Sequence, residues 1–290
     1  MKMNYKTQYN QYLNLIEDYI AEVLERKFKD SENGLTQAMK YSLTAGGKRI
    51  RPVLMLAFCD ILGVDKKRAL PFALAIECIH TSSLIHDDMP CLDNDDMRRG
   101  KPSCHKAYGE GLAMLAGDAL MNFSYELCLE NIENMGEIAA LKYLAKCTGY
   151  QGMLGGQAYD LAWENSTPEE YKLLKIDSLK TSKLIKAPIV MASLLAEKFE
   201  ENIEIFGESL GLMFQFSDDL LDELGDSKTL GKTVGKDKEA GKLTAVYIYG
   251  IEKTKLKINE LKENCIKILN NFQNTEFMVE LVNSLAERKV

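Results

Sequence analysis

The chain has 290 residues, of which 46% are hydrophobic and 27% are charged, a composition typical of a soluble globular protein. Its formal net charge of −7 argues against a general nucleic-acid binder, and its seven cysteines, with no Cys-x-x-Cys pair, argue against a disulfide framework or a zinc knuckle. Residues 1–10 are too polar for a secretory signal, and the longest apolar runs, 69–76 and 189–196, are far shorter than the roughly 18 residues of a membrane span. We therefore expect a cytoplasmic protein with no stable membrane insertion and no nucleic-acid partner.

Apolar residues recur every three or four positions along most of the chain, which predicts α-helices. The first stripe is amphipathic and consists of Tyr5, Tyr9, Tyr12, Ile16, Ile20, Val23 and Leu24. Segments 70–85, 114–129 and 189–195 are apolar almost all round, so we expect buried helices there. Segment 203–224 is another long apolar helix, and segment 256–269 alternates apolar pairs with Lys and Glu like a surface helix.

Breaks between helices are signalled mainly by proline. Thr167 is expected to cap a helix that begins at Pro168, and several of the six prolines are expected at breaks: Pro52, Pro71, Pro90, Pro102, Pro168 and Pro188. No segment alternates with the period of a β-strand, and no linker or composition shift divides the chain. The prediction is a single all-α domain of many helices covering residues 1–290.

Two acidic clusters each close an apolar segment. The first starts at Asp87-Asp88 and continues to Asp93 and beyond, and the second is Asp218-Asp219-Leu220-Leu221-Asp222. Pro90 would clash with the carbonyl of His86, so the first helix is expected to end or distort there, which would bring Asp93 back toward Asp87. Carboxylates this close repel by roughly 4 kcal/mol per pair at 4 Å. Either they are fully solvated or a cation draws them together, and all-oxygen ligands suit Mg²⁺.

Basic residues are clustered in the same way. The groups are Gly46-Gly47-Lys48-Arg49-Ile50-Arg51, Arg98-Arg99, Lys180 and Lys183 around Thr181, and a Gly/Lys segment from 225 to 242. Cations that follow glycines in an acidic protein indicate a phosphate or diphosphate pocket, although segment 225–242 would equally suit a plain flexible loop. Glu77-x-x-His80 has the spacing of a di-iron ligand pair, but that site needs a second copy, which the sequence lacks. With no P-loop and no nucleophile elbow, the chemistry is expected to come from metal ions and cations acting on a diphosphate.

On these residues the chain resembles the trans-isoprenyl diphosphate synthases of the farnesyl and geranylgeranyl type, over about residues 46–242. Asp87-Asp88 with Asp93 matches the first aspartate-rich motif in its longer DDxxxxD form, and Asp218-Asp219-x-x-Asp222 matches the second. The GGKRxRP, RRG, FQxxDD and LGK segments occur in the expected order. The resemblance implies the all-α isoprenoid synthase fold around a deep central cavity, a homodimer, and three Mg²⁺ ions per active site.

The resemblance also implies a role for each matching residue. Asp87, Asp93 and Asp218 would be Mg²⁺ ligands, with Asp88, Asp219 and Asp222 supporting or bound through water. Arg98, Lys180 and Lys232 would hold an allylic diphosphate, with Lys242 also contacting substrate. Lys48, Arg51, His80 and Arg99 would hold isopentenyl diphosphate. Thr181 and Gln215 would face the reacting carbons.

The implied function is that of a short-chain prenyltransferase. It would ionise dimethylallyl or geranyl diphosphate, add isopentenyl diphosphate head to tail, and release diphosphate. Ser82 and Ser83 would lie toward the tail end of the pocket and influence chain length. Farnesyl diphosphate is the expected product, because the long first motif resembles that of bacterial farnesyl synthases. Geranylgeranyl diphosphate is the alternative, because Ser82 is small where farnesyl synthases often carry an aromatic residue, which leaves room for a longer tail.

Two alternatives from other classes are a class I terpene cyclase and a non-catalytic partner subunit of a prenyl synthase. A cyclase would not need Lys48, Arg51 and Arg99, and its second metal motif is of another type. Such partner subunits tend to lose an aspartate cluster, whereas both clusters are intact here.

Overall fold

Almost all of the regular structure is helical in the computed structural model, which describes residues 4–29, 31, 33–224 and 241–287. The α-helices are α1 (Tyr5–Phe28), α2 (Gly34–Leu43), α3 (Ile50–Leu62), α4 (Lys66–Asp87), α5 (Cys104–Tyr108), α6 (Glu110–Leu129), α7 (Met135–Thr148), α8 (Met153–Ala162), α9 (Glu170–Asp177), α10 (Lys183–Leu195), α11 (Glu201–Leu224), α14 (Ala245–Tyr249), α15 (Ile251–Leu269) and α16 (Glu276–Ala286). A π-helical turn, η1 (Ser178–Ser182), joins α9 to α10. The predicted single all-α domain is confirmed.

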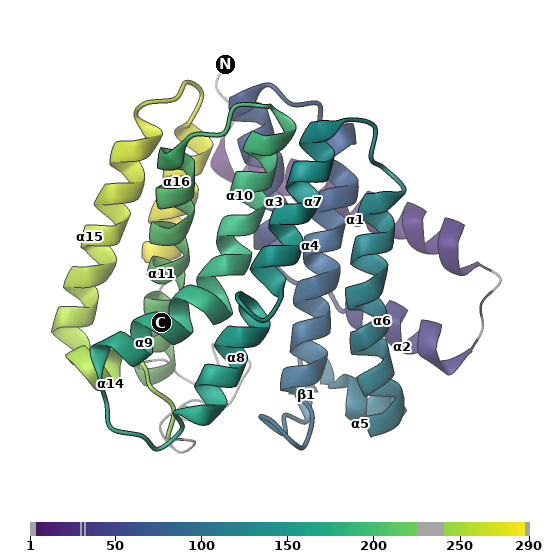
Figure 1. Ribbon diagram of the computed structural model, residues 1–290, viewed down its shortest axis with the longest axis horizontal. Coiled ribbons are helices and arrows are strands. Elements are labelled where there is room, and N and C mark those ends of the chain that lie inside the picture. Colours follow the sequence, from purple (N-terminus) through teal and green to yellow (C-terminus); the bar gives the residue numbers. More distant parts are fainter. Residues whose placement is uncertain (1–3, 30, 32, 225–240, 288–290) are drawn as a thin grey trace.

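Helix α4 forms the centre of the fold (Figure 1). It packs against α3, α6 and α10, so the predicted buried helix over 70–85 is confirmed. Among the helices that the structure describes, α4 alone is long and apolar enough to cross a membrane. The search of the sequence for uninterrupted apolar runs did not identify it. However, 78% of its most apolar window is buried inside the protein, so the neighbouring helices account for its apolar surface.

The other long helices follow the periodic pattern, with one exception. The stripe predicted on α1 is buried from Tyr12 onward, and α11 contains the predicted apolar segment. The exception is α6, which was expected to be buried all round. Leu115 and Leu129 on this helix are 52% and 61% exposed, because α6 lies on the outside of the bundle and covers α4 with its other face (Figure 1).

Several predicted breaks are wrong. Pro71 and Pro188 lie inside α4 and α10, where burial of the surrounding apolar side chains outweighs the backbone hydrogen bond that proline cannot donate. Helix α9 begins at Glu170 rather than at Pro168, and Glu169 takes the N-cap position. Thr167 instead donates to Glu169 Oε1 (2.8 Å) and accepts from Lys172 Nζ (3.1 Å), which holds the preceding turn outside the helix.

The structure also contains a small hairpin that the sequence did not reveal. Strands β1 (Met97–Arg98) and β2 (Lys101–Pro102) pair antiparallel directly after the first acidic cluster. Strands of two residues are too short for alternation to be detected. The hairpin places Arg98 beside Asp88 at the C-terminal end of α4, and Arg99 follows it near Glu77 in the middle of that helix.

Candidate active site

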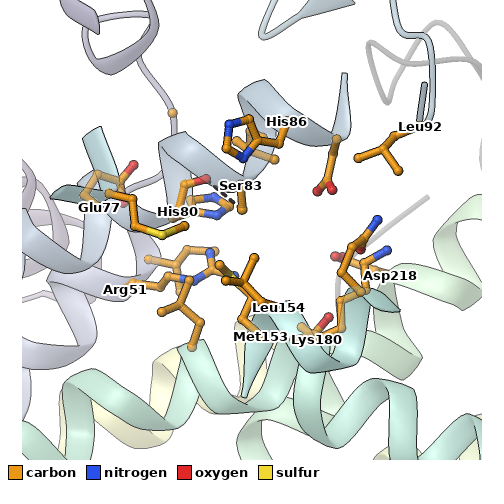
Figure 2. A pocket seen from close by; sticks show the side chains of 18 of the residues that line it. Arg51, Glu77, His80, Ser83, His86, Leu92, Met153, Leu154, Lys180 and Asp218 are labelled. Carbon is orange, nitrogen blue, oxygen red and sulfur yellow. Dashed lines mark hydrogen bonds between the residues drawn. The ribbon is translucent and has the colours of Figure 1, made fainter. Parts of the chain in front are cut away.

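A cavity of about 840 Å³ lies between α4 and the helices that surround it. Its wall includes most of the residues singled out from the sequence: Lys48, Arg51, His80, Ser83, Asp87, Arg99, Lys180, Thr181, Gln215 and Asp218. Figure 2 shows Glu77 and Arg51 toward one end of the cavity and Lys180 and Asp218 toward the other. Segments that are far apart in the sequence therefore meet in one pocket with two differently charged ends.

The end of α4 positions the first acidic cluster. The helix stops at Asp87, Pro90 follows in a turn, and the backbone N–H of Asp93 donates to the carbonyl of Asp87 at 2.9 Å. The predicted return of Asp93 toward Asp87 is confirmed. Burial raises the pKa of the Asp87 carboxyl to about 6; the positive charge of Lys180 opposes this rise, and Asp93 adds to it.

The second acidic cluster lies on the last turns of α11, and its members face different ways. Asp218 lines the main cavity. Asp219 is buried, accepting from Gln215 Nε2 at 2.7 Å and from the backbone N–H of Ala245 at 2.6 Å. Asp222 and Lys242 line a second cavity of about 570 Å³, and Lys242 Nζ donates to Asp93 Oδ1 at 2.9 Å. The pair Lys242–Asp93 thus connects the segment after α11 to the first cluster.

Thr181 and Gln215 are held in a fixed relation to each other. Thr181 Oγ1 donates to Gln215 Oε1 at 2.7 Å, while the amide nitrogen of Gln215 is occupied by Asp219. Asp219 therefore orients Gln215, which in turn fixes the hydroxyl of Thr181. The result is a pair of oxygen dipoles on the wall of the cavity.

Lys180 reaches the cavity from the π-helical turn. A side chain at Gly156 would come within 2.2 Å of the backbone nitrogen of Lys180, so only glycine allows α8 to pass this close. Lys180 Nζ donates to Asp160 Oδ2 at 2.5 Å, and Asp160 is almost fully buried on α8. Sequence reasoning missed Asp160, because a single acid in an otherwise ordinary helix gives no local signal.

Arg98 and Asp88 do not line the main cavity. Arg98 donates to both oxygens of the buried Asp88 carboxylate, with Nε to Oδ1 at 2.9 Å and Nε to Oδ2 at 3.1 Å, and it also contacts Asp95. The two side chains meet at a small neighbouring pocket instead. Asp88 therefore orients Arg98. Lys232 lies outside the described residues.

The cationic end of the cavity is formed by Lys48, Arg51 and Arg99 around His80. Burial lowers the pKa of His80 well below its ordinary value, and the guanidinium groups of Arg51 and Arg99 lower it further. His80 is therefore a neutral hydrogen-bonding group among fixed positive charges. This end of the cavity is suited to a polyanion.

The structure separates the two serines that the sequence grouped together. Ser83 lines the cavity and donates to the carbonyl of His80 at 2.9 Å (Figure 2). Ser82 is fully buried and does not line the cavity. Of the two, Ser83 is the one placed to contact a ligand.

The carboxylates at the acidic end of the cavity have the ligand chemistry of a Mg²⁺ site. Asp87, Asp93 and Asp218 offer only carboxylate oxygens, which is the ligand chemistry that Mg²⁺ prefers. Within the described ranges, no three His, Cys, Asp or Glu side chains converge closely enough to hold a metal ion by themselves. The residues fit ions that take their remaining ligands from a phosphate group and from water, as Mg²⁺ commonly does.

Comparison with known proteins gives consistent matches. The family described as polyprenyl synthetase matches residues 32–285. A farnesyl diphosphate synthase from Micrococcus luteus is 42% identical over 259 residues, which cover 88% of this chain and 87% of the relative. Geranylgeranyl pyrophosphate synthase 4 from Arabidopsis thaliana is 41% identical over 261 residues, which cover 87% of this chain and 70% of the relative. Among solved structures, a geranyltransferase from Helicobacter pylori complexed with magnesium and isoprenyl diphosphate has a TM-score of 0.82 and 29% identity, covering 99% of this chain and 98% of the other.

Proposed function

The chain belongs to the polyprenyl synthetase family and is a short-chain prenyltransferase, and from this premise we propose that it adds isopentenyl diphosphate to dimethylallyl or geranyl diphosphate and releases farnesyl diphosphate. The observation that carries the proposal is the division of one cavity into two ends. Asp87, Asp218 and Lys180 face one end, and the cations around His80 face the other. Each end is suited to one diphosphate, and the space between them is suited to the reacting carbons.

The allylic diphosphate would lie between Asp87 and Asp218, beside Lys180. Mg²⁺ ions bound there, three by analogy with the family, would neutralise the charge that builds on the departing diphosphate. The geranyltransferase from Helicobacter pylori, complexed with magnesium and isoprenyl diphosphate, supports this assignment. Lys180 would move from Asp160 to the phosphate oxygens, exchanging one anion for another.

The chain's own residues shape the carbon chemistry. As the allylic C–O bond breaks, the oxygens of Thr181 and Gln215 would stabilise the positive charge on the allylic carbons. The terminal double bond of isopentenyl diphosphate attacks the allylic carbon, which forms the new C–C bond. A proton then leaves the adjacent carbon for the departing diphosphate, so no basic side chain is required. Apolar lining residues, among them Met153, Leu184 and Phe214, would keep water away from the cation.

The second substrate would be held at the cationic end. Lys48, Arg51 and Arg99 would pair with the diphosphate of isopentenyl diphosphate, and neutral His80 would add a hydrogen bond. A class I terpene cyclase has no second diphosphate to bind. This cluster therefore favours the condensing enzyme over the cyclase.

Geranylgeranyl diphosphate is the second candidate product. The small side chain of Ser83 leaves the α4 wall of the cavity open, which favours a longer tail. Relatives of both types match this chain at nearly the same identity, 42% and 41%.

The proposal is tested by incubating the purified protein with isopentenyl diphosphate and, in turn, dimethylallyl, geranyl and farnesyl diphosphate, with Mg²⁺ or with a chelator. Products are identified by mass spectrometry. We expect Mg²⁺-dependent elongation that stops at farnesyl diphosphate, whereas accumulation of the longer product would establish the second candidate. No elongation with any primer would refute the proposal. We also expect a homodimer, which light scattering on the purified protein would test.

A further inference from the structure

A buried acid lies within the cationic end of the cavity. Glu77 is 1% exposed and lies on α4, three residues before His80. It is one of the residues that line the cavity, and Figure 2 shows it beside His80. A carboxylate in a pocket proposed to bind an anion weakens that binding by charge alone, so its position requires another explanation.

Arg49 is the first partner of Glu77. Its side chain is completely buried, and Nη1 donates to Glu77 Oε1 at 2.8 Å. Its other two nitrogens also donate inside the protein, with Nε to Glu17 at 2.7 Å and Nη2 to the carbonyl of Leu43 at 2.6 Å. Arg49 therefore compensates the charge of Glu77, and each of its three nitrogens makes a contact within the protein.

Arg99 is the second partner. Its Nη2 lies 3.6 Å from the same oxygen of Glu77, and its guanidinium lies so close to Gly47 that a Cβ there would be 3.0 Å from Cζ. Arg99 is thus confined between the backbone of Gly47 and the carboxylate of Glu77. Both arginines border the cavity, but the Arg49 side chain is fully buried whereas that of Arg99 remains 19% exposed.

The geometry points to Glu77 as a positioning residue for isopentenyl diphosphate: it aims the guanidinium of Arg99 at the substrate, while Arg49 offsets its negative charge. This inference rests on the proposed function, because it takes the cationic end as the isopentenyl diphosphate site. A flexible arginine loses rotamer freedom when it binds a phosphate, and a partner that fixes it beforehand reduces that loss. The charges of Arg49 and Arg99 balance those of Glu77 and Glu17, so Lys48 and Arg51 give this end of the cavity its net positive charge.

Charge and positioning predict opposite results when Glu77 is neutralised. If Glu77 acted only through its charge, Glu77→Gln would strengthen binding of isopentenyl diphosphate, because one negative charge is removed. If Glu77 positions Arg99, the same change weakens binding, because the charge-assisted contact is lost. We expect KM for isopentenyl diphosphate to rise about tenfold, with KM for geranyl diphosphate and kcat nearly unchanged.

Glu17→Gln is the matched control. Glu17 also pairs with Arg49, is 39% exposed, and does not line the cavity. A purely structural role of the Arg49 cluster would give both variants the same phenotype, namely a lower melting temperature and unchanged KM values. Positioning gives the rise in KM to Glu77→Gln alone.

A double-mutant cycle with Arg99→Gln identifies the residue through which Glu77 acts. Arg99→Gln should itself raise KM for isopentenyl diphosphate, and adding Glu77→Gln should raise it no further. Independent, multiplying effects of the two changes would overturn the inference. So would an unchanged or lower KM in folded Glu77→Gln protein.

Two further measurements keep the test decisive. If Glu77→Gln does not fold, as judged by circular dichroism, Glu77→Asp replaces it. This variant keeps the charge but its side chain is one methylene shorter, so the same selective rise in KM for isopentenyl diphosphate is expected. Calorimetric titration with isopentenyl diphosphate separates the two proposals. Failure of the unmodified protein to bind it counts against the proposed function, whereas binding that Glu77→Gln leaves unchanged or strengthens overturns only the role of Glu77.

Discussion

Enlarging Ser83 should shorten the product of the enzyme. Ser83 lies on the cavity wall four residues before Asp87, which is about 6 Å along the helix axis from the diphosphate end. Phenylalanine is tolerated in a helix, so Ser83→Phe is expected to fold and to place its ring in the space that the growing tail occupies. The longest product of the unmodified enzyme should then give way to one shorter by a single isoprene unit.

The size of the effect follows from the apolar burial that is lost. Burying each CH₂ group is worth about 0.8 kcal/mol, so excluding a five-carbon isoprene unit removes up to about 4 kcal/mol from the last elongation step. Because about 1.4 kcal/mol corresponds to a factor of ten in rate, that step should slow by up to about a thousandfold. Earlier steps, which place less of their tail beside Ser83, should be slowed less.

The assay supplies isopentenyl diphosphate with dimethylallyl diphosphate and measures product lengths by mass spectrometry. Ser83→Ala, which adds no bulk, is the control and should leave the product distribution as it is. Ser82→Phe is the comparison, because Ser82 is fully buried away from the cavity and its enlargement should mainly lower the melting temperature. An active Ser83→Phe enzyme with the original products, or a larger shift from Ser82→Phe, would refute the placement of Ser83.

Three further predictions concern other parts of the molecule. Asp218→Asn should lower kcat at least about a hundredfold and raise the Mg²⁺ concentration needed for half-maximal activity, and an unchanged kcat would exclude Asp218 from the metal site. Arg49→Met should leave Glu77 buried without its main counter-charge, so the free energy of unfolding, measured by urea denaturation, should fall by about 3–5 kcal/mol. A fall of less than about 1 kcal/mol would contradict this reasoning. Burial alone would raise the pKa of Glu137, but the backbone amide of Glu133 and the guanidinium of Arg68 hold it below its ordinary value of 4.5. The stability that Glu137 contributes is therefore present above about pH 4.5 and is lost as the pH falls through the lowered pKa. Melting curves between about pH 3 and 6 should show that acid lowers the melting temperature less in Glu137→Gln than in the unmodified protein. An unaltered pH dependence of the melting temperature would contradict this reasoning.

Much of the local structure was accessible from the sequence because its causes are local. The 3.6-residue repeat of apolar side chains predicted α1 and α11, and the steric conflict at Pro90 predicted both the end of α4 and the return of Asp93. The motifs that carry the chemistry were also visible, since their residue types and spacing can be read without a fold. Proline was the misleading local signal, because Pro71 shows that a buried helix tolerates the loss of one hydrogen bond.

The partners of the charged side chains were not accessible in this way. Arg49 and Arg51 are indistinguishable cations in one short segment, yet Arg49 is fully buried against Glu77 and Glu17 whereas Arg51 is partly exposed in the cavity. Such pairings join residues that are tens of positions apart, and they depend on how whole helices pack. No local pattern encodes them.

Helix periodicity and ligand chemistry are properties of short segments, so the order of residues was enough to predict a helical bundle with two acidic clusters and a pocket for a diphosphate. The packed fold was needed to show that Ser83 rather than Ser82 faces the cavity, and that Arg98 is held by Asp88. A helix that is apolar on every side carries no mark of which side meets a ligand. That side is set by the neighbouring helices, whose arrangement follows from packing the whole chain at once.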